Sequence, residues 1–191
     1  MPTNRLEAFS DGVIAIIITI MVLELKIPHG IDLESLRPLL PSFVTYVLSF
    51  IYLGIYWNNH HHMLHVVEWV SGGVLWANMH LLFWLSLIPF ATGWMGENHF
   101  AELPTAMYGV VLLMAAIAYK ILVVAILSHN GRDSKLGQAL GSDVKGNLSM
   151  VIYAAAIPLA FVTQWVAEAI YVLVALMWLV PDRRIETKLG A

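Results

Sequence analysis

The sequence predicts an all-α, polytopic membrane protein, and its composition and hydrophobic patterning support this fold class. Of the 191 residues, 59% are hydrophobic and 12% are charged, whereas soluble domains are about 45–50% apolar and about 25% charged. The mean hydropathy is +0.75. The apolar residues gather in six runs, each near the ~20 residues that a membrane-spanning helix requires. These runs do not alternate apolar and polar residues, as the strands of a membrane barrel would.

The six runs predict six transmembrane helices within one domain that covers residues 1–191. Pro28 ends the first run, and Pro41 and Pro104 stand where the second and fourth helices should begin, because proline fits the first helical turn. Pro89, late in the third run, is expected to kink its helix. The fifth and sixth runs are the shortest. The expected spans are about residues 8–26, 42–66, 70–94, 104–128, 147–163 and 166–181.

The distribution of lysine and arginine predicts that the N- and C-termini are both cytoplasmic, because cytoplasmic loops carry an excess of these residues. With the N-terminus inside, Lys26 and Arg37 fall in outer loops and Lys120 lies within the fourth span. The other seven lie in cytoplasmic segments: Arg5, Arg132, Lys135, Lys145, Arg183, Arg184 and Lys188. There is no basic patch suited to nucleic acid, so nucleic acid is not an expected partner, and the expected surroundings are a lipid bilayer.

The first predicted helix carries a narrow apolar stripe. At about 100° per residue, Gly12, Ile16, Thr19 and Leu23 fall within an arc of ~60°, and Ile20 lies beside it. An Ile/Leu stripe with one small residue is typical of a helix-packing face. The same stripe would also suit a pore that several chains enclose together. The residues alone leave both interpretations open.

Ser10 and Asp11 point away from this stripe, towards neighbouring helices. A carboxylate within a membrane is costly and needs a partner. The candidates for Asp11 are Arg5 and hydrogen-bond donors on the second and third spans. Ser-Asp near a helix start is also typical of an N-cap.

The polar residues ahead of the first span form the motif Arg5-x3-Phe9-Ser10-Asp11, followed directly by "GVIAIIITIMVLEL". This motif resembles the signature of the lysosomal and prokaryotic transmembrane-protein-175 potassium channels. The resemblance extends through "YWNNHHHM" at 56–63 and "LWANMHLLFWLSLIPF" at 75–90, and beyond residue 93 it rests on topology. A single six-span unit resembles the prokaryotic branch, whose members are tetramers. This implies a homotetramer in the plasma membrane of a prokaryote.

The resemblance implies a potassium-permeable cation channel, with passive conduction through a pore lined by the first helix of each subunit and without a TVGYG filter. In the family, the residue five positions after the motif aspartate forms the narrowest constriction, and here that residue is Ile16. Pore-facing positions then follow at Thr19 or Ile20 and at Leu23. Whether the Thr19 hydroxyl or the apolar Ile16 dominates selectivity stays open. Such a channel is not an enzyme and needs no cofactor, only permeant potassium or other monovalent cations.

The family's motif belongs to a buried polar network that ties the first helix to the second and third. The resemblance therefore implies that Arg5, Phe9, Ser10 and Asp11 hold the pore helix in register. The expected neighbours, whose pairings the sequence does not give, are His60, His61, Trp76, Asn78 and His80.

Two other functions compete with the channel. In "HHHMLH", His61 and His65 lie one helical turn apart, a spacing that suits the metal site of a membrane enzyme. No HExxH pattern accompanies them, and the lack of cysteine excludes thiolate ligands. These histidines could also sense protons, but hydrogen bonding is the role we expect. A proton-coupled transporter of small solutes would use Asp11 and a histidine, yet the sequence has no acid–base pair in mid-membrane.

The remaining aromatic and charged residues predict contacts with the membrane interface and within the bundle. Trp76 and Trp84 are expected to pack inside the bundle, and Lys120 to snorkel or to form an ion pair. Glu24 is expected at the outer interface, where four copies would make a weak cation-attracting ring. Five tryptophans near span ends predict aromatic belts: Trp57, Trp69, Trp94, Trp165 and Trp178.

Overall fold

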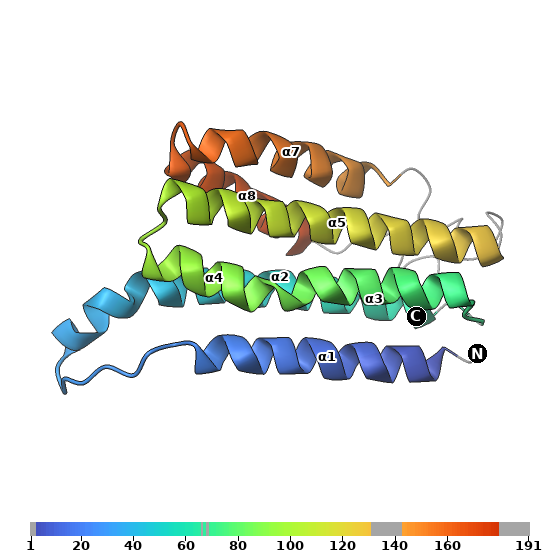
Figure 1. Cartoon of the computed structure of the whole chain (residues 1–191), viewed down its shortest axis with the longest axis horizontal. Coiled ribbons are helices and arrows are strands. Elements are labelled where there is room, and N and C mark those ends of the chain that lie inside the picture. Colours follow the sequence, from blue (N-terminus) through green and yellow to red (C-terminus); the bar gives the residue numbers. More distant parts are fainter. Residues whose placement is uncertain (1–2, 66, 68, 131–142, 180–191) are drawn as a thin grey trace.

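The computed structural model describes residues 3–65, 67, 69–130 and 143–179, and this part of the chain folds into a bundle of helices (Figure 1). The elements are α1 (Asn4–Leu23), the 3-10 helix η1 (Leu33–Leu39), α2 (Leu40–His65), α3 (Gly72–Ser86), α4 (Ile88–Glu97), α5 (Glu102–Asn130), α7 (Val144–Ala160) and α8 (Gln164–Leu179). The all-α prediction is confirmed for the described residues.

Each of the six predicted runs corresponds to a helix. Four helical segments are long and apolar enough to cross a membrane, namely α1, η1 with α2, α3 with α4, and α5. The helices α7 and α8 are apolar but shorter, with 17 and 16 residues. The largest difference is at the first run, which was expected to begin near residue 8. The helix begins at Asn4 because the polar residues ahead of the apolar run continue it, with Leu6 and Glu7 amides donating to the Thr3 carbonyl.

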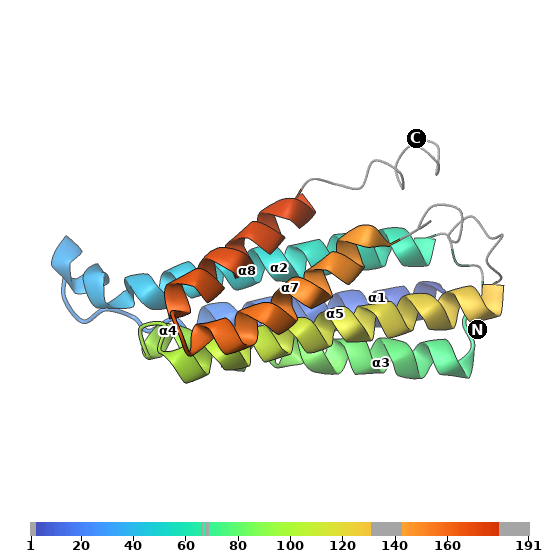
Figure 2. The same ribbon diagram turned by 90° about the horizontal axis from the view of Figure 1, so that it is seen from above.

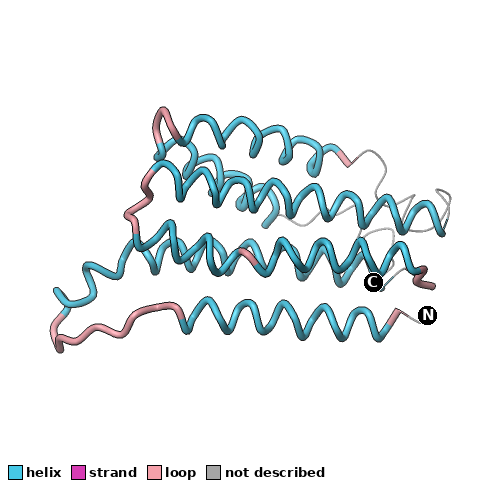
Figure 3. Tube along the Cα trace, viewed as in Figure 1, coloured by secondary structure: helices cyan, strands magenta, loops and turns pink. Residues whose placement is uncertain are grey.

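The third span consists of two helices that meet at Leu87. α3 ends at Ser86 and α4 begins at Ile88, and the interruption is visible in the trace of Figure 3. Pro89 follows at the start of α4. Proline has no amide hydrogen, so it cannot extend the hydrogen-bond ladder of α3. The helix is thus interrupted two residues before Pro89, close to the expected kink.

The helix α1 lies at one edge of the bundle. Figure 1 shows α1 along one edge and α7 along the opposite one, with α2 to α5 between them. α1 packs against α2, α3 and α4, while α5 packs against α3 and α7. Figure 2 shows α7 and α8 diverging from their shared turn, and α8 contacts α2 as well as α5. One whole face of α1 therefore has no partner within the described part of the chain.

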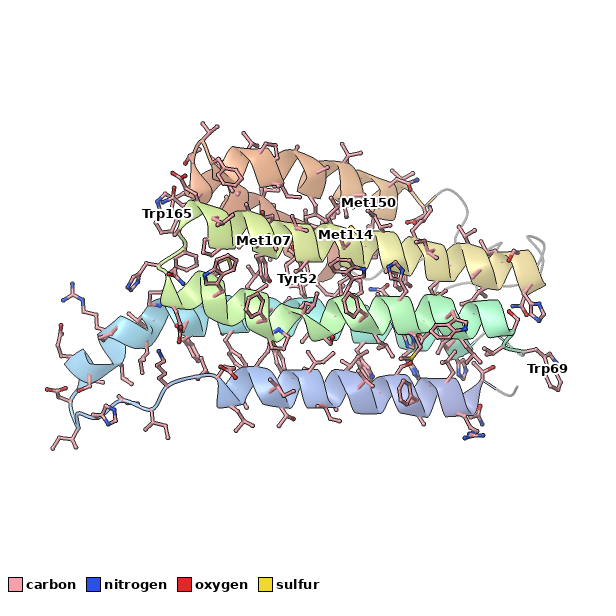
Figure 4. All side chains as sticks on the ribbon, viewed as in Figure 1. Tyr52, Trp69, Met107, Met114, Met150 and Trp165 are labelled. Atoms are coloured by element: carbon pink, nitrogen blue, oxygen red, sulfur yellow. The ribbon has the colours of Figure 1, made fainter. Side chains whose placement is uncertain are left out.

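Small residues and buried hydroxyls join the central helices. Gly96 of α4 lies so close to α2 that an added Cβ atom would stand 2.7 Å from the Ser42 Cα. Tyr52 lies at the centre of the bundle (Figure 4), where its hydroxyl donates to the Tyr171 carbonyl at 2.6 Å and accepts from the Tyr153 hydroxyl at 3.1 Å. Helices in lipid associate through close packing and such hydrogen bonds, because lipid is as apolar as the side chains themselves.

The tryptophans and Lys120 partly follow the sequence expectations. Trp69 and Trp165 lie at opposite ends of the bundle, as aromatic belts require (Figure 4). Lys120 forms an ion pair with Asp143, with 3.2 Å between Nζ and Oδ2. Trp76, which was expected inside the bundle, is instead 79% exposed in the single chain.

Candidate functional site

The helix α1 has two opposite faces. Its buried residues recur at spacings of three or four, so they form one face of the helix: Leu6, Ser10, Ile14, Ile17 and Met21. The predicted stripe faces the other way, and we call it the exposed stripe: Gly12, Ile16, Thr19, Ile20 and Leu23. At about 100° per residue the centres of the two faces are roughly 140–150° apart.

The exposed stripe is apolar and unpacked within a single chain. Ile16 is 61% exposed and Leu23 is 76% exposed, although both are large hydrophobic side chains. The Thr19 hydroxyl donates to the Ala15 carbonyl of the same helix at 2.9 Å. Its donor is thereby satisfied without another chain, while its oxygen still has room to accept a hydrogen bond or to contact a cation.

A groove of about 680 Å³ runs along one side of the stripe, between α1 and α4. Ile16 and Ile20 of α1 line it, together with Phe90 of α4. Glu24 and Glu97 lie at the end of the groove where α1 and α4 both terminate. Glu24 is exposed, as the sequence predicted. The groove leaves space beside the stripe for another helix or for lipid.

A buried chain of hydrogen bonds joins α1 to α3 and α2. The Ser10 hydroxyl donates to the Leu6 carbonyl at 2.8 Å and accepts from Asn78 Nδ2 at 3.0 Å. Asn78 Oδ1 in turn lies 2.7 Å from His60 Nε2, which donates to it. Ser10, Asn78 and His60 are all buried, and we call them the polar clamp. These hydrogen bonds offset part of the cost of burying polar groups inside a membrane protein, while the Nδ1 atom of His60 has no partner recorded in the described residues.

Two further contacts join α1 to α2 at the same end. The Glu7 carboxylate lies 2.7 Å from His61 Nδ1, and Asp11 Oδ1 accepts from Trp57 Nε1 at 2.9 Å. His60 and His61 are neighbours in sequence but point about 100° apart. One of them therefore reaches α3 while the other reaches α1.

The structure leaves four of the expected network residues outside these contacts. Arg5 and Phe9 are exposed, since they lie on the same side of α1 as the exposed stripe. Trp76 and His80 are each two residues from Asn78, so they point to the other side of α3. His80 accepts a hydrogen bond from Trp84 Nε1 at 3.0 Å, within its own helix.

Glu7 and Trp57 are the contact residues that the sequence reasoning did not place in the network. Glu7 is four residues before Asp11 and three before Ser10, so its side chain lies near theirs on a helix. Trp57 is four residues before His61 and stacks on its ring at 6.0 Å. Helical spacing could have identified both, but Trp57 was expected in an aromatic belt and Glu7 was given no role.

The histidines of α2 do not assemble into a metal site among the described residues. His61 and His65 stack with ring centroids 6.0 Å apart. Within the described residues, no group of three or more histidine, cysteine, aspartate or glutamate side chains is placed to hold a metal ion. His60 and His61 instead serve as hydrogen-bond partners, the role that the sequence favoured.

Comparison with known proteins gives a consistent result. Residues 5–89 match the family model described as the endosomal/lysosomal potassium channel TMEM175. A protein of Chryseobacterium sp. (strain P1-3), named a potassium channel, is 56% identical over 189 residues, which cover 99% of this chain and 98% of that protein. A second protein named a potassium channel, from Streptomyces collinus (strain DSM 40733 / Tue 365), is 33% identical over 63% of this chain and 62% of its own length.

The fold also matches a solved structure. The crystal structure of a lysosomal potassium-selective channel TMEM175 homologue from Chamaesiphon minutus superposes with a TM-score of 0.81. The match has 28% sequence identity and covers 93% of this chain and 96% of that chain. Together with the motif and the helical bundle, these likenesses establish that the chain belongs to the TMEM175 family of polytopic membrane proteins.

Proposed function

We propose that four copies of this chain form a potassium-permeable channel, in which the exposed stripe of α1 lines the pore. Conduction is passive and needs no cofactor or chemical step. The observation that carries the proposal is the unpacked apolar stripe on a helix at the edge of the bundle. The family membership supports potassium as the permeant ion.

The position of α1 suits a shared axis. A helix at the edge of a protomer becomes central when protomers assemble with that edge inward. The exposed stripe and the buried face lie on nearly opposite sides of α1. The stripe can therefore face the shared axis while the buried face stays packed in the core of its own chain. In this arrangement the groove beside Ile16 and Ile20 receives the neighbouring protomer.

Ile16 forms the narrow neck of the proposed pore. A ring of isoleucine side chains excludes water from a narrow passage, and a hydrated cation cannot cross it while it is dry. A small rotation or widening of the four helices admits water, and a cation then passes with part of its hydration shell. Thr19 lies about one turn further along α1, and the four copies of it in the tetramer would offer four hydroxyl oxygens to the ion.

The polar clamp sets which side of α1 faces the axis. One residue of register corresponds to about 100° of rotation, so a slip by one residue would move Ile16 off the axis. Such a slip would also separate Ser10 from Asn78, leaving buried polar groups unpaired, which costs about 1–3 kcal/mol for each group. The clamp therefore stabilises one rotation of the helix over the others.

The charge distribution supports an orientation with both termini in the cytoplasm, and we place the channel in the plasma membrane of a prokaryote. In this orientation the clamp lies at the cytoplasmic end of the pore and Glu24 at its outer end. Four copies of Glu24 would raise the local concentration of cations at the entrance.

The test is a reversal-potential measurement on purified protein in a lipid bilayer, with potassium on one side and sodium on the other. The wild-type protein should give a reversal potential near the potassium equilibrium value. Ile16→Asn should raise the resting leak and move the reversal potential towards zero, because a polar ring keeps the neck wet.

The matched control is Val22→Asn, an exposed aliphatic residue of the same helix about 120° away from Ile16. Val22→Asn should leave both leak and selectivity close to wild type. If both variants behave alike, or if Ile16→Asn changes neither quantity, Ile16 is not the neck. Absence of any cation current from correctly folded wild-type protein would reject the channel itself.

A further inference from the structure

Glu168 is the one acidic side chain that is buried among the described residues. It is 9% exposed and lies in α8, on the far side of the bundle from α1. Its Oε1 atom is buried without a hydrogen-bond partner in the described part of the chain. A carboxyl group placed inside a membrane protein in this way usually has a function, and neither the pore nor the polar clamp uses it.

Two hydroxyl donors of this region, those of Thr105 and Tyr171, are already committed to other acceptors. Thr105 of α5 is a neighbour of the Glu168 carboxyl group, and no hydrogen bond between the two side chains is recorded in the described residues. The single hydroxyl hydrogen of Thr105 is donated to the Phe100 carbonyl at 3.1 Å. Tyr171, one turn further along α8, donates its hydroxyl hydrogen to the Thr105 carbonyl at 3.2 Å.

This count of hydrogens distinguishes the two protonation states of Glu168. A neutral carboxylic acid can donate its own hydrogen to the Thr105 hydroxyl oxygen, which has free lone pairs. Every hydrogen bond then remains in place. An ionised carboxylate has no hydrogen to give, so it could be satisfied only if Thr105 released the Phe100 carbonyl. The burial of Glu168 and its unpartnered Oε1 atom therefore fit the neutral acid.

The charged and titratable groups around Glu168 do not favour the ionised form either. The helices packed against α8 are α2, α5 and α7, and the titratable side chains that they place against Tyr171, one turn along α8 from Glu168, are phenols, namely Tyr52, Tyr108 and Tyr153. Phenols remain neutral up to about pH 10.

No compensating cation is recorded for the Glu168 side chain within the described residues. An unpaired carboxylate in such an interior is strongly disfavoured, and the group binds a proton instead.

We infer that Glu168 is a proton-binding site, at which a bound proton holds α8 against α5. The group lies about 6 Å along α8 from Gln164, at the end of the bundle that carries the α4–α5 connection (Figure 1). Protons would therefore exchange with the solution at that end, which is the outer face in the proposed orientation. Loss of the proton leaves a buried negative charge and separates α8 from Thr105. This site does not depend on the pore assignment.

Infrared spectroscopy of the purified protein tests the protonation state directly. A neutral carboxylic acid has a C=O stretching band that ionised carboxylates lack and that shifts on ¹³C labelling of glutamate. At about pH 7, where an ordinary glutamate is ionised, the wild-type protein should show this band. Glu168→Gln should abolish it, whereas Glu102→Gln, the exposed control on α5, should leave it unchanged. Absence of the band in the wild-type protein, or its survival in Glu168→Gln, overturns the inference.

Thr105→Val provides a second variant in case Glu168→Gln does not fold. Removing the hydroxyl oxygen frees the acid from its hydrogen bond, so the C=O band should persist and shift to higher frequency. A band that Thr105→Val leaves at the wild-type frequency would contradict the contact on which the site rests.

Thermal unfolding tests the consequence for α8. Between about pH 4 and about pH 7 the unfolding midpoint of the wild-type protein and of Glu102→Gln should fall, because over this range the folded protein keeps a proton on Glu168 that the unfolded chain has already lost. Glu168→Gln carries an amide that donates as the neutral acid does, and its midpoint should fall less. Equal pH dependence in the wild-type protein and Glu168→Gln would show that no stabilising proton is bound there.

Discussion

Replacing Asn78 with alanine should weaken the attachment of α1 more than any other single truncation in the polar clamp. Asn78 is fully buried and is the middle member, bonded to Ser10 on one side and to His60 on the other. Ser10 would keep its bond to the Leu6 carbonyl. His60 would be left with no recorded hydrogen bond to its side chain, because its Nδ1 atom already lacks a partner in the described residues and its Nε2 atom would lose Asn78.

The expected loss of stability has three parts: the unpaired His60 ring, the lost hydrogen bond to Ser10 and the cavity left by the amide group. Leaving the buried His60 ring unpaired costs about 1–3 kcal/mol. A lost side-chain hydrogen bond between membrane helices averages about 0.6 kcal/mol. The small cavity left by the amide group adds about 1 kcal/mol at most, if the helices close over it partly. We therefore expect Asn78→Ala to lower the free energy of unfolding by about 2–4 kcal/mol.

The assay is reversible unfolding of the purified protein in mixed micelles, followed by circular dichroism. Asn58→Ala is the control, because Asn58 is exposed on α2 and its replacement should change stability by no more than about 0.5 kcal/mol. A double-mutant cycle with Ser10→Ala should give a coupling of about 0.6–1.7 kcal/mol. If Asn78→Ala costs no more than Asn58→Ala, the clamp does not hold α1.

Two further substitutions test the packing of the bundle. Gly96→Ala should destabilise the protein by about 1–3 kcal/mol, because its Cβ atom would stand 2.7 Å from the Ser42 backbone. The control Gly93→Ala, whose Cβ atom would meet nothing within 4 Å, should be neutral or stabilising in the same unfolding assay. Equal effects of the two substitutions would contradict the close approach of α4 and α2. Tyr52→Phe removes a donor to the Tyr171 carbonyl and an acceptor for Tyr153, and should cost about 1–2 kcal/mol. Tyr46→Phe is its control, since no hydrogen bond of the Tyr46 hydroxyl is recorded in the described residues, and a cost as large as that of Tyr52→Phe would show that the central hydroxyls do not join the helices.

The helices could be predicted from the sequence because their determinants are local. A run of apolar residues in lipid must satisfy its backbone hydrogen bonds within itself, which leaves the helix as the outcome. Pro89 marked the division between α3 and α4 for an equally local reason, since a proline cannot donate to the preceding turn. The ends were less certain, because Asn4, Arg5 and Glu7 are polar yet belong to α1, ahead of the apolar run.

Pairings between helices were beyond the sequence because they depend on how two helices are rotated against each other. The motif identified Ser10 correctly as a residue that faces other helices, and Asn78 and His60 as its neighbours. The sequence offered Arg5 or donors on the second and third spans as partners for Asp11, and the structure pairs Asp11 with Trp57 of the second span. Nothing local to either residue specifies this contact, since it requires α1 and α2 to cross at one particular height.

Helical spacing could have excluded some of the expected neighbours. Trp76, Asn78 and His80 are successively two residues apart, so adjacent members of this series point to opposite sides of α3. Only Asn78 meets α1, while Trp76 is exposed and His80 bonds within its own helix. Glu168 escaped notice for a different reason. It lies in α8, a short span that the motif does not reach, and its burial depends on contacts with α5.

The composition of α1 explains why a helix that is proposed to line a pore needs polar contacts at one end. Between Val13 and Leu23 the helix is apolar on almost every side, so burial of hydrophobic surface distinguishes poorly between one rotation and another. Lipid, a neighbouring chain and the protomer core would each accept the isoleucines of this segment. Ser10 is different, because it is satisfied only where Asn78 can reach it. A satisfied polar group contributes little net stability but penalises every rotation that separates it from its partner. The rotation that is left buries Ile14 and Ile17 and turns Ile16 outward. The side chain proposed as the neck is thus placed by a serine almost two turns away, and replacing that serine should disturb the pore without touching it.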